Sequence, residues 1–87
     1  MSETHENRLK RLQMRSMRRG IKEMDIILSR YADAHLAGMD APALDLYEAL
    51  LNENDQDLYQ WVTGQAPAPK ALAPMIARIS QAISGAK

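Results

Sequence analysis

Residues 38–51 read Gly-Met-Asp-Ala-Pro-Ala-Leu-Asp-Leu-Tyr-Glu-Ala-Leu-Leu and contain the clearest helix start in the chain. Asp40 is a good N-cap residue, Pro42 is tolerated in a first turn, and Met39 and Leu44 are spaced as a hydrophobic staple. The apolar face of the expected helix is formed by Leu44, Tyr47, Leu50 and Leu51. Gly38, just before this start, is placed to end a preceding helix in a left-handed cap.

Helical spacing continues on both sides of this segment. A first helix is expected over residues 3–17, where Leu9, Leu12 and Ser16 share one face. A second is expected over residues 21–36, and its stripe is formed by Met24, Ile27, Leu28, Tyr31, Ala34 and His35. After a turn at residues 52–55, the apolar residues of a short fourth helix ending at Gly64 are Leu58, Trp61 and Val62. The last helix is expected to start near Pro74, because proline is poorly tolerated deep in a helix. Its apolar positions are Leu72, Met75, Ile76, Ile79 and Ile83.

The pattern predicts an all-α fold, a compact bundle of about five short helices in a single domain over residues 1–87. No strand signal or repeat is present, residues 1–7 are expected to be flexible, and residues 65–73 form an Ala/Pro-rich connection to the last helix. One core is expected from Leu28, Tyr31, Leu44, Leu50, Leu51, Trp61, Ile76 and Ile79.

Composition excludes several classes of function. The 87 residues include no cysteine, so disulfides, thiolate catalysis and cysteine-ligated zinc are excluded. No apolar run approaches the roughly 20 residues that span a bilayer, and the first residues carry no apolar segment. We therefore expect a cytoplasmic chain, monomeric when free and without direct membrane insertion.

Catalytic chemistry is not expected. His5 falls in the expected flexible tail, and His35 lies near a helix end without a second histidine at ligand spacing. The sequence has no Gly-rich phosphate loop, nucleophile elbow or paired metal-ligand motif. The chain is therefore expected to be neither an enzyme nor a metal-binding protein.

Charge is distributed unevenly although the formal net charge is zero. Seven of the eleven Lys and Arg residues lie in residues 8–22, and nine of the eleven acids lie in residues 23–57. On a continuous helix the stripe of cations would be Arg8, Arg11, Arg15, Arg18 and Lys22. This stripe is either a solvated face or a contact for an anionic partner, and the zero net charge argues against nucleic acid.

Three methionines surround the first interhelical break: Met14, Met17 and Met24. Methionine at helical spacing is mostly core, but exposed methionine would suit an adaptable protein-binding patch.

Residues 19–23, Arg-Gly-Ile-Lys-Glu, form an R-G-x-x-E string at the same break. Gly20 would allow a positive φ or a close approach to another surface. Glu23 falls in a first helical turn, where the helix dipole favours an acid. The plain interpretation is a helix end followed by an N-terminal acid, with an Arg19–Glu23 ion pair.

About thirty residues later comes the segment 50–61, Leu-Leu-Asn-Glu-Asn-Asp-Gln-Asp-Leu-Tyr-Gln-Trp. The early R-G-x-x-E string, this acidic segment and its Trp61, together with the length and helix layout, resemble the FAD assembly factor family of succinate dehydrogenase and fumarate reductase. The family is also called succinate dehydrogenase assembly factor 2, or SdhE in bacteria. The resemblance covers roughly residues 8–63, and the tail from residue 65 matches no family motif.

The resemblance implies a five-helix protein that binds the flavoprotein subunit and promotes covalent attachment of FAD to one of its histidines. FAD is then the cofactor of this subunit, called the client below, and no tightly bound cofactor is expected in this chain. Arg19, Gly20 and Glu23 match the motif that faces the client. The neighbouring residues expected at the rim of this contact are Arg15, Arg18 and Asp25.

Two functions of another class stay open on the sequence. One is a small regulator that binds nucleic acid through residues 8–22, and the other is an antitoxin-like inhibitor of a protein.

Overall fold

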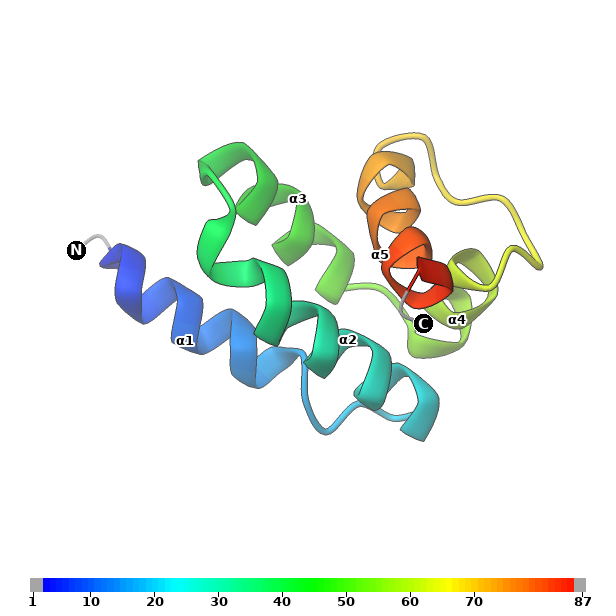
Figure 1. Ribbon diagram of the computed structural model, residues 1–87, viewed down its shortest axis with the longest axis horizontal. Helices are drawn as coiled ribbons and strands as arrows, with labels where there is room; N and C mark the ends of the chain where they lie inside the picture. The colour runs from blue at the N-terminus through cyan, green and yellow to red at the C-terminus, as the bar shows by residue number, and fades with distance from the viewer. Residues whose placement is uncertain (1–2, 86–87) are drawn as a thin grey trace.

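Five α-helices and one 3₁₀ turn make up the computed structural model, which describes residues 3–85 (Figure 1). In chain order the elements are α1 His5–Arg15, α2 Lys22–His35, η1 Leu36–Gly38, α3 Ala41–Leu51, α4 Asp55–Val62 and α5 Ala73–Gly85. Within these residues there is no strand, so the predicted all-α bundle is confirmed.

Side chains cap three of the helix starts. The side chains of Thr4, Asp40 and Asn54 each accept a hydrogen bond from a first-turn N–H of α1, α3 and α4. The cap at Asp40 agrees with the sequence analysis, and the cap at Asn54 lies in the predicted turn at residues 52–55. The structure starts α1 directly after Thr4, and the flexibility of residues 1–7 stays a prediction.

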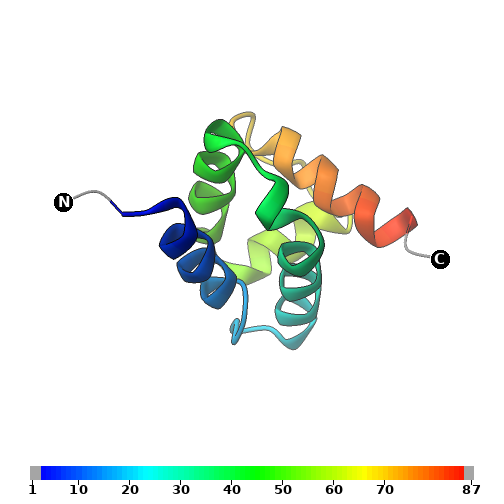
Figure 2. The same ribbon diagram turned by 60° about the vertical axis from the view of Figure 1, so that its left-hand side comes forward.

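The helices surround one hydrophobic core (Figure 2). The expected core residues are buried with one exception. Trp61 is only half-buried, packing against the core from its edge, so its expected burial is wrong. Trp61 lies in α4 as predicted, but the buried residues of that helix are Leu58 and Val62.

The end of α1 is fixed to α3 by a buried hydrogen bond. Ser16 is fully buried, and its hydroxyl lies 2.8 Å from the Leu12 carbonyl oxygen, to which it donates, and 2.6 Å from the Tyr47 hydroxyl. Burial raises the pKa of Tyr47 to about 12, although the Ser16 contact opposes this rise. The expected Leu12–Ser16 face is therefore an inward face.

The end of α2 differs from the prediction. Gly38 does not adopt a left-handed conformation, because α2 continues into the η1 turn, where the Met39 N–H donates to the Leu36 carbonyl. Among the described residues only Arg18 (φ 55°) and Gly64 (φ 80°) have positive φ. A tighter 3₁₀ turn can satisfy terminal carbonyls in place of a left-handed cap.

The last helix begins as expected. Pro74 is the second residue of α5, where a missing N–H costs nothing because no intrahelical partner exists there. An irregular turn precedes it, with the Leu72 N–H 2.9 Å from the Pro69 carbonyl.

Candidate functional site

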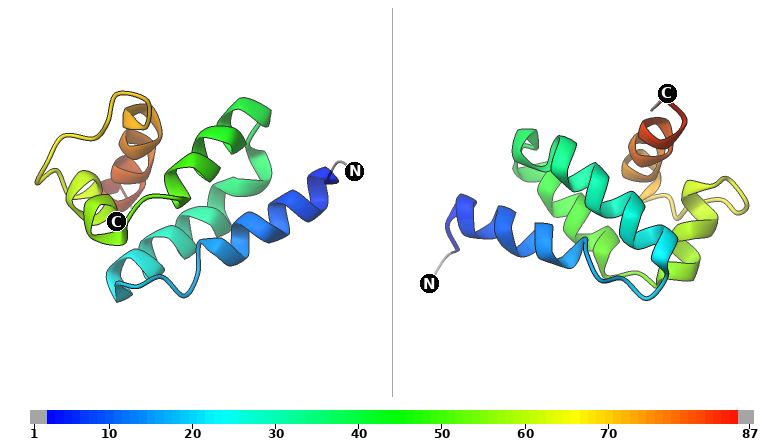
Figure 3. Two further views of the ribbon diagram at one scale, coloured as in Figure 1. Left: turned by 180° about the vertical axis from the view of Figure 1, so that it is seen from behind. Right: turned by 60° about the horizontal axis from the view of Figure 1, so that its bottom comes forward.

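The connection between α1 and α2, residues 16–21, lies beside the connection between α3 and α4 (Figure 3). Arg18 within it adopts a left-handed conformation, which costs about 1 kcal/mol for a residue that carries a Cβ. Such a conformation persists only where the surroundings hold the backbone. The next two residues supply that restraint.

Arg19 is held by a carboxylate and three carbonyls. Its Nε donates to Asp55 Oδ1 at 2.7 Å, and its Nη2 lies 2.6 Å from the same oxygen. Its remaining hydrogen bonds reach the carbonyl oxygens of Arg15, Leu51 and Glu53 at 3.1–3.3 Å. The Arg19 and Asp55 side chains are only 12% and 13% exposed. Arg19 therefore joins the end of α1 to the end of α3 and the start of α4.

Gly20 contacts the other oxygen of the same carboxylate. Its N–H donates to Asp55 Oδ2 at 2.5 Å, and a Cβ built on Gly20 would lie 3.2 Å from that oxygen. Gly20 itself does not have a positive φ. Of the two roles that the sequence allows for this glycine, the structure shows the close approach.

Asp55 thus brings the two sequence motifs into one site. Asp55 belongs to the acidic segment, and its carboxylate contacts Gly20 and Arg19 of the R-G-x-x-E string. These two residues lie 35 and 36 positions before Asp55 in the sequence. The sequence analysis treated Asp55 only as part of a turn and of a family motif. The contact of Asp55 with Arg19 could not be predicted, because residues 23–57 contain nine acids and nothing in the sequence distinguishes Asp55 as the partner.

The other site residues fall into two groups. Arg18, Gly20 and Glu23 are exposed, and Glu23 makes no ion pair with a described residue. The expected Arg19–Glu23 pair is therefore wrong, because Arg19 turns to Asp55 instead. The remaining two side chains are half-buried. Arg15 donates to Asn52 Oδ1 at 2.6 Å, and Asp25 accepts from Ser29 Oγ at 3.2 Å.

Exposed methionines lie next to this site. Met24 is fully buried, as expected of a core residue, but Met14 is 72% exposed and Met17 is 44% exposed. The core interpretation is therefore wrong for the two methionines that precede Gly20. Their exposure fits the alternative, an adaptable protein-binding patch, which stays a prediction.

The predicted stripe of cations does not form a continuous row. Helix α1 ends at Arg15, so Arg18 and Lys22 leave its line. Arg8 binds Asp45 and Glu48 of α3, while Arg11 binds Glu48 and Glu3, with nitrogen–oxygen distances of 2.6–3.1 Å. Hydrogen bonds from Arg11 and Arg8 hold the pKa of Glu48 below its ordinary value. The opposite charges that are separated in sequence are thus brought together in space.

Comparison with known proteins places the chain in a family. The family model described as "flavinator of succinate dehydrogenase" matches residues 10–83. The chain belongs to this family. The predicted resemblance is therefore confirmed, and the match extends beyond residues 8–63 into the Ala/Pro-rich connection and α5.

Individual relatives of the chain support the same family assignment. The chain is 46% identical over 61 residues to succinate dehydrogenase assembly factor 2, mitochondrial, of Meyerozyma guilliermondii, covering 70% of this chain and 45% of the relative. It is 46% identical over 63 residues to the protein of the same name from Candida glabrata, covering 72% and 41%. It is 38% identical over 80 residues to assembly factor 2-A, mitochondrial, of Drosophila yakuba, covering 90% and 49%. The chain spans less than half the length of these flavinator relatives.

The expected cytoplasmic location is contradicted by these names, since the relatives are named mitochondrial proteins. That expectation depended on the composition of the first residues and on the lack of cysteine. Neither property identifies a compartment. The cytoplasmic assignment is withdrawn.

The part of the chain that the structure describes has neither a metal-binding cluster nor a membrane-spanning helix. Within residues 3–85, no three side chains of His, Asp or Glu gather as a metal site would need. No helix in that part of the chain is both long and apolar enough to cross a membrane.

Proposed function

We propose that this chain binds the flavoprotein subunit of succinate dehydrogenase, or of the related fumarate reductase, and promotes covalent attachment of FAD to that subunit. Membership of the flavinator family supports the proposal, as do relatives named assembly factor 2 of succinate dehydrogenase. In this proposal FAD belongs to the client, and the chain is not itself an enzyme.

The observation that carries the proposal is the contact of Arg19 and Gly20 with one carboxylate, that of Asp55, whose side chain is only 13% exposed. Asp55 fixes the backbone of the R-G-x-x-E segment before any client arrives. A prefixed surface loses less conformational entropy on binding than a mobile loop does. Gly20 then offers exposed backbone without a side chain, and the client surface approaches it closely.

The site residues divide their work in this proposal. Arg18, Gly20 and Glu23 contact the client, because all three are exposed and neither Arg18 nor Glu23 forms an ion pair with a described residue. Arg19 acts as a positioning residue, since its guanidinium is already occupied by Asp55.

The two half-buried residues complete the rim. Arg15 and Asp25 retain accessible surface, and their hydrogen bonds to Asn52 and Ser29 orient them. The exposed Met14 and Met17 add adaptable apolar area beside them.

The chain's contribution to flavin attachment is conformational. The chain has no cysteine and, among the described residues, no metal-binding cluster, and in this proposal the bond-forming chemistry is assigned to the client and its flavin. A factor that binds one conformation of the client raises the population of that conformation. Holding the reacting groups of the client close together increases their effective concentration.

The nucleic-acid alternative is less favourable. Arg8, Arg11 and Arg15 all lie within ion-pair distance of acids on α3. A phosphate-binding surface needs uncompensated cations, because affinity comes from the release of counterions.

Gly20→Arg tests the proposal, with Ala71→Arg as the control. Ala71 is also exposed outside the helices, in the connection between α4 and α5. Both variants are compared for binding to a purified flavoprotein subunit and for covalent flavin, scored by in-gel fluorescence after denaturation. We expect Gly20→Arg to lose both activities and Ala71→Arg to keep them. Circular dichroism confirms that each variant is helical.

Glu23→Ala removes a charged contact with the client and leaves the exposed backbone at Gly20 unchanged. Glu23 and Glu6 are both first-turn acids without an ion pair in the described chain, so Glu6→Ala controls for the loss of a helix-dipole interaction. We expect a partial loss of flavin attachment for Glu23→Ala alone. Full flavin attachment by folded Gly20→Arg and Glu23→Ala proteins would show that this segment does not contact the client.

A further inference from the structure

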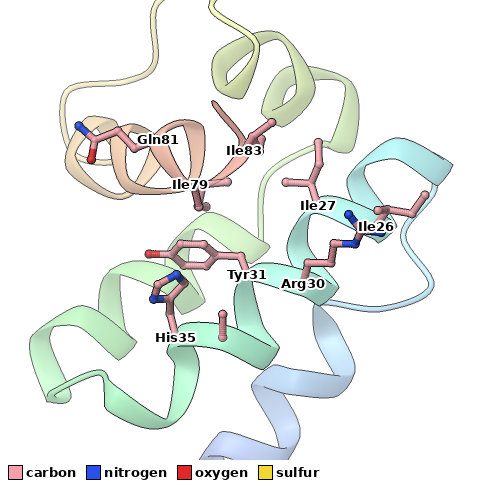
Figure 4. A pocket seen from close by; sticks show the side chains of 10 residues that line it. Ile26, Ile27, Arg30, Tyr31, His35, Ile79, Gln81 and Ile83 are labelled. Atoms are coloured by element: carbon pink, nitrogen blue, oxygen red, sulfur yellow. The ribbon is translucent and has the colours of Figure 1, made fainter. Parts of the chain in front are cut away.

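A second surface lies between α2 and α5, at the edge of the buried face of α2 (Figure 4). A hollow of about 570 Å³ opens there, with Ile26 and Ile27 on one wall, Ile79 and Ile83 on the other, and Tyr31 at its floor. A neighbouring hollow of about 660 Å³ shares several of these lining residues and reaches Asp40. The two form one groove along α2, called here the α2–α5 groove.

One end of the α2–α5 groove exposes apolar side chains. Ile26 is 45% exposed and Ile83 is 43% exposed. They are two of the four large hydrophobic residues exposed in the described chain, and the other two are the methionines beside Gly20. Exposed apolar side chains that gather around a hollow typically mark an interaction site.

The groove also carries cations without acidic partners. Arg30 lines the first hollow and Arg78 the second, and neither makes an ion pair with a described residue. The paired arginines of the molecule are Arg8, Arg11, Arg15 and Arg19. Among the described residues, the one acid lining the groove is Asp40, which accepts the Ala43 N–H as the cap of α3. The charge of the groove therefore fits an occupant that carries a carboxylate.

The α2–α5 groove is continuous with residues 19–23, the R-G-x-x-E segment of the proposed client contact. Glu23, Ile27 and Arg30 follow at i, i+4 and i+7, which places them on one face of α2. From Glu23 to His35 the helix rises roughly 18 Å at about 1.5 Å per residue. A partner seated on Gly20 and Glu23 reaches the groove within about one helical turn.

We propose that the α2–α5 groove binds a second segment of the flavoprotein client, one that presents aliphatic side chains to Ile26 and Ile83 and a carboxylate to Arg30. This inference rests on the proposed function and extends the client contact from the loop at Gly20 along α2. Arg30 supplies the specific contact, because guanidinium binds carboxylate through two parallel hydrogen bonds. Tyr31 and His35, whose ring centroids lie 4.6 Å apart, line both hollows.

The test uses the full chain and a purified flavoprotein subunit as the probe. Arg30→Glu and Ile26→Ser are compared with Lys70→Glu, an exposed charge reversal in the connection before α5 that lines neither hollow. We expect Arg30→Glu to weaken binding about tenfold, Ile26→Ser several-fold, and Lys70→Glu not at all. Arg30→Lys should recover only part of the affinity, because lysine lacks the paired donors. Melting temperatures show that the variants remain folded.

Three results would overturn the inference. If Arg30→Glu and Ile26→Ser bind like Lys70→Glu while Gly20→Arg fails, the groove is not a client contact and the proposed function stands. If the wild-type chain does not bind the flavoprotein subunit, the proposed function fails and the groove inference with it. If light scattering shows a wild-type dimer that Arg30→Glu and Ile26→Ser dissociate, the occupant is a second copy of the chain.

Discussion

Asp55→Asn is the most informative single substitution in this molecule. The carboxylate accepts two contacts from Arg19 and one from Gly20, and asparagine can replace only one of its two oxygens. The substitution leaves a guanidinium that is 12% exposed without its counter-charge. Because Arg19 keeps its three carbonyl contacts, we expect a loss of about 2–3 kcal/mol, below the cost of breaking a fully buried pair.

The assay is thermal and urea unfolding followed by circular dichroism. For a chain of this size the loss corresponds to a fall in melting temperature of about 10–20 °C. Asp45→Asn is the matched control, since Asp45 also binds an arginine but is 70% exposed. The control should unfold within experimental error of the wild type, because exposed ion pairs contribute little. Equal, small effects of the two substitutions would refute the role given to Asp55.

Two further predictions concern α3 and its neighbours. Arginine contacts lower the pKa of Glu48, so its ion pairs stabilise the folded chain above the ordinary glutamate pKa and are lost as the pH falls through the lowered value. The difference in unfolding free energy between wild type and Glu48→Gln should therefore be present at pH 7 and shrink as the pH falls below the ordinary glutamate pKa, and a difference that stays constant in acid would contradict the assignment. Leu50→Ala should cost about 2–4 kcal/mol because Leu50 is fully buried, whereas half-buried Trp61→Ala should cost less in the same urea titration.

Local signals predicted most of the helices. The cap at Asp40, the start at Pro74 and the break at Gly20 depend on a few neighbouring residues, and each is confirmed. Predictions that need a partner distant in sequence were less successful. Arg19 could be paired with Glu23 by spacing alone, but its actual partner lies 36 residues away.

The candidate site shows the same division. Sequence motifs identified the R-G-x-x-E string and the acidic segment. They did not show that the two segments contact each other at Asp55. The uneven charge distribution was visible, but only the packing of α1 beside α3 shows that Arg8 and Arg11 face acids there. Periodicity placed Trp61 on the apolar face of α4, but it cannot distinguish the centre of a core from its edge.

The contact between Arg19 and Asp55 closes a ring of chain that contains α2, η1 and α3. A polypeptide still leaving the ribosome, or one whose fourth helix has melted, lacks the carboxylate that shapes the Gly20 backbone. Such a chain does not present the fixed segment, even though residues 19–23 are all present. In the proposed function, competence to bind the client is therefore tied to completion of folding, so unfinished or damaged copies would not occupy the flavoprotein unproductively.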